Sequence, residues 1–229
     1  MRSTLGVAVG IAALAGATLV TRADYVSIDT YAESLTVMGV NGTDTTNHLV
    51  QFVPVTTAVG GARDTLLTLD SSGPFTDVSD GATVRVGGDV DSLSYASAPG
   101  IGGTLSLTYG SLGDLNLDMS GHDGLLLGFA SVDLPLTFDV TLTSNGASAS
   151  STYSVPAGNS AVQIPFSDFA GFDASSLDMA KLVFRPQVGG DFILVPPSGS
   201  AIPEPASLGL VALGAAGLLR RRSRRPASA

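Results

Sequence analysis

Apolar and polar residues alternate along short runs in the middle of the chain, which is the pattern of a strand with one buried face. The alternation holds in residues 65–69, 82–86, 104–109, 135–143, 161–166, 181–185 and 191–195. Turn-forming residues separate these runs, and Asn145-Gly146 favours a tight hairpin because both residues tolerate positive φ. The pattern predicts an all-β fold, a single β-sandwich of jelly-roll type.

The same alternation predicts which side chains form the core. The inward-facing apolar positions are Leu67, Leu69, Val84, Val86, Leu105, Leu107, Phe138, Val140, Leu142, Ile164, Phe184, Phe192 and Leu194. Helix signals are weak in this part of the chain. The best of them predicts a short turn in residues 173–180, with Ser175 or Ser176 able to cap it.

The N-terminal end has the pattern of a secretory signal peptide. Arg2 gives a short positive start, residues 5–20 are apolar and uncharged, and small residues precede Asp24. An apolar run of about 16 residues is shorter than the roughly 20 that a membrane span needs. We therefore predict that residues 1–23 are a cleaved signal peptide.

The C-terminal end has three parts in order. Pro203, Glu204 and Pro205 form a rigid break, and residues 206–219 are apolar and uncharged. Five arginines follow: Arg220, Arg221, Arg222, Arg224 and Arg225. A helix over 206–219 would be about 21 Å long, short of a ~30 Å hydrocarbon core, a gap that snorkelling arginines and local bilayer thinning can close. We predict a short transmembrane helix with a cytoplasmic arginine cluster.

This three-part end resembles the PEP-CTERM sorting signal of exported bacterial proteins. The resemblance implies that an exosortase, a membrane transpeptidase, processes the chain near the motif after the helix has held it briefly in the membrane. It also implies delivery to the cell envelope or to an extracellular polysaccharide matrix. Pro203, Glu204 and Pro205 would then be recognition residues for another enzyme, and exopolysaccharide would be a candidate partner.

The chain thus divides into a signal peptide (1–23), a β-sandwich domain (24–195), a Pro/Gly/Ser linker (196–202) and the sorting signal (203–229). A second resemblance concerns the domain. The segments 60–64, 101–110 and 169–195 resemble a domain layout found in exported PEP-CTERM proteins, and the last strand pair resembles galactose-binding-like jelly rolls. The second resemblance implies a fold and no activity.

Charge is placed unevenly between these parts. The net charge is −9 overall, yet residues 24–203 hold four basic and nineteen acidic residues, a net charge of −15. An acidic domain argues against nucleic acid as a partner. The absence of cysteine excludes disulfides, thiol nucleophiles and cysteine-bound metal sites.

No set of residues in the sequence predicts catalysis. Ser120, His122 and Asp123 are sequence neighbours, whereas a catalytic triad is assembled from separate segments, and no G-x-S-x-G elbow is present. The chain also lacks tryptophan, the usual sugar-stacking residue, although Tyr95, Tyr109 and Tyr153 could replace it. We therefore expect a protein that is not an enzyme.

Calcium is the one cofactor that the sequence suggests, because calcium prefers carboxylate and carbonyl oxygens. The densest carboxylates are Asp114, Asp118 and Asp123, which match no EF-hand loop. The alternative is that they are solvated turn residues. Arg63 and Asp64 follow two glycines and suggest a structural ion pair.

The leading interpretation is an exported, non-enzymatic β-sandwich protein, held in the membrane and then released to the cell surface or matrix. A carbohydrate- or calcium-binding module is the second interpretation, and a polysaccharide hydrolase is the third. The sequence names neither the ligand nor the oligomeric state.

Overall fold

A computed structural model describes residues 24–32, 34, 36–41, 46–52, 58–69, 81–88 and 91–197. The predicted signal peptide, the sorting residues Pro203, Glu204 and Pro205 and the arginine cluster lie outside these residues. No helix in the described ranges is long and apolar enough to cross a membrane.

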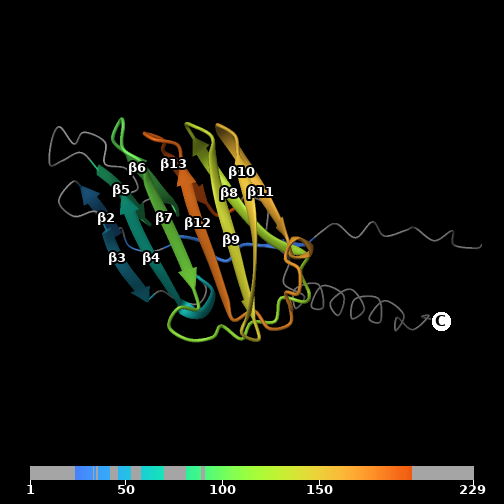
Figure 1. The fold of residues 1–229 in the computed structure, drawn as a ribbon. Helices are drawn as coiled ribbons and strands as arrows, with labels where there is room; N and C mark the ends of the chain where they lie inside the picture. The colour runs from blue at the N-terminus through green and yellow to red at the C-terminus, as the bar shows by residue number, and fades with distance from the viewer. Residues whose placement is uncertain are drawn as a thin grey trace, which may run out of the picture.

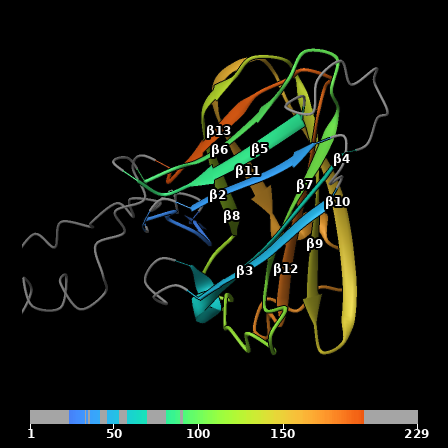
Figure 2. The ribbon, with the colours of Figure 1, turned by 90° about the vertical axis from the view of Figure 1, so that its left-hand side faces the viewer.

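The described chain folds into two β-sheets that face each other (Figures 1 and 2). The first, called the β8 sheet, contains β1 (Tyr25–Val26), β2 (Thr36–Asn41), β5 (Gly81–Val86), β6 (Leu93–Ser97), β8 (Gly124–Val132), β11 (Gly158–Pro165) and β13 (Phe192–Val195). The second, the β9 sheet, contains β3 (Thr46–Phe52), β4 (Ala62–Leu69), β7 (Gly103–Tyr109), β9 (Leu136–Ser144), β10 (Ala147–Val155) and β12 (Met179–Pro186). Two short 3₁₀ turns, η1 (Val59–Gly61) and η2 (Phe166–Asp168), complete the fold. The prediction of an all-β, two-sheet sandwich is confirmed.

The strand order shows how the chain passes between the two layers. The β8 sheet has the order β1-β8-β13-β6-β5-β2, with β11 also paired to β8, and the β9 sheet has the order β10-β9-β12-β7-β4-β3. From β6 onward, the chain changes sheet at every connection except the β9–β10 hairpin. Every strand pair is antiparallel except β1 with β8, which is parallel and only two residues long.

The β9–β10 hairpin forms at the predicted turn. Asn145 and Gly146 have φ values of 51° and 74°, and Ser144 pairs with Ala147. Two positive φ angles suit the right-handed twist of a hairpin, which explains why Asn-Gly stands here. Because the turn fixes the register, the two strands pair along all nine residues of β10 without a bulge.

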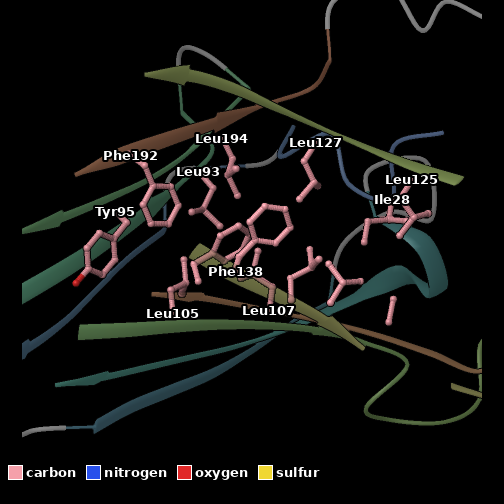
Figure 3. Close-up of a cluster of buried hydrophobic side chains, with 14 of the residues drawn as sticks. Ile28, Leu93, Tyr95, Leu105, Leu107, Leu125, Leu127, Phe138, Phe192 and Leu194 are labelled. Carbon is pink, nitrogen blue, oxygen red and sulfur yellow. The ribbon is translucent and has the colours of Figure 1, made fainter. Parts of the chain in front are cut away.

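The core lies between the sheets, where inward side chains from both layers meet (Figure 3). Of the thirteen predicted core residues, twelve are buried and Leu69 is partly buried against them. Phe184 connects the layers, because its ring lies 5.4 Å from Phe138 in the β9 sheet and 5.3 Å from Phe192 in the β8 sheet. A cysteine-free domain is therefore stabilised by apolar and aromatic packing between the layers.

The predicted turn in residues 173–180 is present, but its cap is not a serine. The carboxylate of Asp173 accepts the backbone N–H of Ser175 at 3.0 Å, and its carbonyl accepts the N–H of Ser176 at 3.1 Å. Asp173 is thus the capping residue, and the chain enters β12 at Met179.

Candidate functional site

A surface recess of about 570 Å³ lies where β1, the start of β8 and the end of β11 meet. It is lined by Tyr25, His122, Asp123, Pro165, Phe166, Ser167 and Ala174, and we call it the Tyr25 recess. Gly124 permits the close approach of these elements, because a Cβ there would lie 2.2 Å from a β11 carbonyl oxygen.

Backbone bonds of Asp123 join three separate segments at this recess. Its N–H donates to the carbonyl of Asp24 at 2.7 Å, and its own carbonyl accepts the N–H of Phe166 at 2.9 Å. Its carboxylate accepts the N–H of Asp24, also at 2.7 Å, and the Asp24 carboxylate lies 3.2 Å from Nδ1 of His122. The recess therefore places an aromatic pair, a histidine and carboxylates on one partly exposed surface.

Tyr153 is the one predicted stacking tyrosine that remains partly exposed. Its hydroxyl donates to Asp168 at 2.9 Å, and its ring stacks on Phe138 at 5.5 Å. Partial burial, and then the bond to Asp168, raise the pKa of Tyr153 to about 12. The hydroxyl therefore stays protonated at neutral pH and acts as a donor.

The prediction that Tyr95 and Tyr109 could stack on a sugar is wrong, because both are core residues with relative exposures of 1% and 0%. Tyr95 stacks on Phe192 at 5.2 Å, and Tyr109 donates its hydroxyl to the buried Asp29. The alternation of β7 places Tyr109 on the same face as Leu105 and Leu107, so this outcome follows from the pattern itself.

The Ser120, His122 and Asp123 set is not assembled as a catalytic triad. Ser120 bonds to Asp118 through both its backbone N–H, at 2.9 Å, and its side chain. His122 pairs with Asp24 instead of Ser120.

Asp114, Asp118 and Asp123 lie in different local settings. Asp114 lines another recess of about 380 Å³ beside the exposed Phe52, whereas Asp123 belongs to the Tyr25 recess. The hydrogen bonds from Ser120 lower the pKa of Asp118, as in a capped turn. Within the described ranges, no three His, Asp or Glu side chains are grouped so that they could hold a metal ion.

Calcium binding at these three residues stays a prediction. It is tested by following thermal unfolding of the protein while calcium is titrated. A rise in Tm that is lost in the Asp118→Asn, Asp123→Asn double variant supports the site, and an unchanged Tm contradicts it.

A buried ion pair lies beneath the sandwich surface, and its partners differ from the predicted Arg63–Asp64 pair. Arg63 pairs with Asp29 rather than with Asp64, through Nε at 2.6 Å and Nη2 at 3.1 Å, and neither side chain is exposed. Asp64 instead contacts His48 at 2.6 Å. Arg63 lies on the same face of β4 as Thr65 and Leu67, because side chains alternate along a strand, so its burial could have been predicted from the sequence.

The Asp29 carboxylate is fully occupied by donors. Besides Arg63, it accepts the hydroxyl of Tyr109 at 2.8 Å and the backbone N–H of Tyr31 at 2.7 Å. Burial, and then the charge of Asp29, raise the pKa of Tyr109 well above 10, so that the hydroxyl stays a donor. Arg63 also donates to Gln51 at 3.3 Å. The network joins the segment after β1 to β4 and β7.

The described residues form a β-sandwich domain with the Tyr25 recess on its surface, and the candidate triad is not assembled in it. Beyond it, residues 201–225 match the family model of the PEP-CTERM protein-sorting motif. The chain thus carries this protein-sorting motif at its C-terminal end, and the match does not extend to the β-sandwich domain.

Three solved structures to which the chain has a distant similarity are described as carbohydrate-binding modules. The family 11 module of a cellulosomal cellulase from Clostridium thermocellum is 13% identical over 72% of this chain and 94% of that one, with a TM-score of 0.30. The same module in complex with a β-1,3-1,4-mixed-linked tetrasaccharide gives the same identity and TM-score over 95% of its length. TmCBM61 in complex with β-1,4-galactotriose is 11% identical over 77% of this chain and all of that one, with a TM-score of 0.25. No curated protein matches the sequence.

Proposed function

We propose that this protein is an exosortase substrate, exported and then sorted to the cell envelope or the extracellular polysaccharide matrix. The observation that carries the proposal is the sorting motif at residues 201–225, which follows a folded β domain whose last strand ends at Val195. On this proposal, residues 1–23 are removed as a signal peptide, and residues 206–219 hold the chain in the membrane until it is processed. The sandwich is the part that remains outside the cell.

Sorting is tested in the native host by fractionation and immunoblotting. The triple variant Pro203→Ala, Glu204→Ala, Pro205→Ala is expected to accumulate as an uncut, membrane-bound precursor, while Pro196→Ala, a proline upstream of the motif, matures normally. A host that lacks its exosortase should give the same precursor. Normal maturation of the triple variant, or uncut wild-type chain in the cytoplasm, would contradict the proposal.

We further propose that the domain is not an enzyme and that its strands follow the jelly-roll arrangement. The bonding of Ser120 to Asp118 and of His122 to Asp24 supports the first statement, because neither leaves a serine–histidine pair. The strand orders support the second statement. Strands β6, β13, β8 and β11 are neighbours in one sheet, and β7, β12, β9 and β10 are neighbours in the other, which is the arrangement of eight strands in two Greek keys.

Carbohydrate binding at the Tyr25 recess is the second candidate function. Tyr25 and Phe166 offer half-buried aromatic faces beside the hydrogen-bonding groups of His122 and Asp123. Apolar faces with a few convergent polar groups are what a sugar ring requires for stacking and orientation. The composition of the recess, rather than likeness to any other protein, supports this candidate.

Isothermal calorimetry with the host's exopolysaccharide tests carbohydrate binding. Tyr25→Ala and Phe166→Ala are each expected to weaken binding at least about tenfold, the equivalent of ~1.4 kcal/mol. Phe52→Ala is the matched control, because Phe52 is also aromatic and is 79% exposed outside the recess. No binding by the wild type, or equal losses in all three variants, would exclude the recess as the binding site.

A further inference from the structure

The chain leaves its last strand across the sandwich surface. After β13 ends at Val195, the next residues pass over the neighbouring strand β8 at Gly128. A Cβ on Gly128 would lie 2.8 Å from the carbonyl oxygen of Val195 and 3.2 Å from Cα of Pro197. Any side chain at position 128 would therefore displace the departing chain.

Pro197 forms one wall of a recess of about 500 Å³ on the outer surface of the β8 sheet. The other walls come from β8, β11 and β13, and they include Leu126, Ala130, Asn159, Ala161 and Val195. None of the lining residues is charged. We call this hollow the exit recess.

Irregular strand pairing shapes the exit recess. The register of β11 against β8 shifts between Gly158 and Ser160, and that of β13 against β8 shifts between Ile193 and Leu194. Both shifts fall opposite the same part of β8, from Phe129 to Val132. A bulge bends a strand and re-aims its side chains, which leaves the sheet surface hollowed at this point.

The sequence after Pro197 fits this hollow in size and polarity. Ser198, Gly199, Ser200 and Ala201 are small and uncharged. Adjacent strands lie about 4.8 Å apart and an extended chain advances about 3.3 Å per residue, so two residues lead from β8 to β11. The strand β11 is at the edge of the sheet, so an extended chain running in this direction would reach that edge within a few more residues.

We propose that residues 198–201 bind in the exit recess in an extended conformation, crossing from Pro197 over Ala161 toward Asn159. The sorting motif then emerges at the β11 edge of the sandwich, at a distance from the domain that the recess fixes. The occupant is this chain's own segment because its preceding residue, Pro197, already forms a wall of the recess. This inference does not depend on the identity of any sugar or metal ligand.

Disulfide trapping tests the proposal, since the natural chain contains no cysteine. Ala201→Cys is combined with either Asn159→Cys or Gln163→Cys in the full-length chain. Both partners are exposed amide residues of β11, two positions to either side of Ala161. Only Asn159 lines the exit recess.

If residues 198–201 are bound, the chain carrying Asn159→Cys should form its disulfide at least about ten times faster than the chain carrying Gln163→Cys under the same mild oxidant. Ala130→Phe, which fills the recess from β8, should reduce this ratio to about two or less, and Ala130→Glu serves as a second blocking variant if the first lowers the Tm. Ratios below two in the unblocked chain, failure of both pairs to form, or a ratio that neither blocking variant changes would each overturn the proposal.

Discussion

Asp29→Ala is expected to destabilise the domain more than any surface substitution, because it removes the partner of a buried charge. The Asp29 carboxylate accepts four hydrogen bonds: two from Arg63, one from the Tyr109 hydroxyl and one from the Tyr31 backbone. Arg63 and Asp29 are both unexposed, so Asp29→Ala leaves the charge of Arg63 buried without its carboxylate partner.

The expected loss follows from the cost of breaking a buried pair. Removing one partner of such a pair costs about 3–5 kcal/mol. For a domain of this size, roughly 2–4 °C per kcal/mol converts the loss into a Tm decrease of about 6–20 °C. Replacing both partners by apolar residues, as in Asp29→Leu with Arg63→Met, should cost less than Asp29→Ala alone, since no unpaired charge remains.

Urea unfolding followed by far-ultraviolet circular dichroism measures these free energies, and a double-mutant cycle separates the pair from the two side chains. A loss of less than about 1 kcal/mol in Asp29→Ala would show that the buried pair does not stabilise the domain. In the cycle, a loss in the double variant equal to the sum of the losses in Asp29→Leu and Arg63→Met would show that the pair has no coupling energy.

Three further predictions concern the Tyr25 recess and its surroundings. Gly124→Ala should cost about 1–3 kcal/mol in urea unfolding, because its Cβ would meet a backbone oxygen at 2.2 Å; an unchanged midpoint would show that β11 can shift. The pKa of Tyr153 is raised from 10 to about 12 in the folded state, so folding favours the protonated phenol. The protonated Tyr153 therefore stabilises the folded state fully below pH 10, and this stabilisation is lost as the pH rises to about 12. Tyr153→Phe should therefore flatten the fall in the urea midpoint between these pH values, and an equal fall in both proteins would contradict it. Cleavage after Ala23 would place the α-ammonium group of Asp24 2.7 Å from the Asp123 carboxylate. Asp123→Asn should therefore lower the Tm of the mature protein more than that of the precursor. Equal decreases in Tm would argue against this pairing.

Alternation predicted seven of the strands, β4, β5, β7, β9, β11, β12 and β13, and it did not predict β1, β2, β3, β6, β8 or β10. Along β9, from Leu136 to Ser144, buried residues alternate strictly with exposed or half-buried ones, as predicted. The first six residues of β8 are apolar or glycine, and all of them are buried except the half-buried Leu126, so the pattern has no period of two. The strand β10 consists almost entirely of Ala, Ser and Thr, and only its pairing with β9 through the Asn145-Gly146 turn makes it a strand.

The candidate site was less predictable than the fold because its residues meet from distant parts of the chain. Asp24 and Asp123 are 99 positions apart, and Tyr25 meets Phe166 only through the parallel pairing of β1 with β8. Local density of carboxylates, the signal used for calcium, selected Asp114, Asp118 and Asp123, which the fold then distributed among different local contacts. Spacing along the sequence thus indicated that aspartates are abundant in this segment, but it did not indicate which of them lie together in the fold.

The N-terminal segment shows why two aspartates of this acidic domain are more than solubilising groups. The strand β1 is two residues long and pairs with β8 over those two residues, which is too little to hold the segment by itself. Asp24 fixes one end through reciprocal bonds with Asp123, and Asp29 fixes the other through its buried pair with Arg63. Because Tyr25 lies between these two attachments, breaking the Asp29–Arg63 pair should disturb the Tyr25 recess as well as the core, although the two are built from different strands. We therefore expect the buried Asp29–Arg63 pair to contribute to the position of Tyr25, which forms one wall of the candidate site.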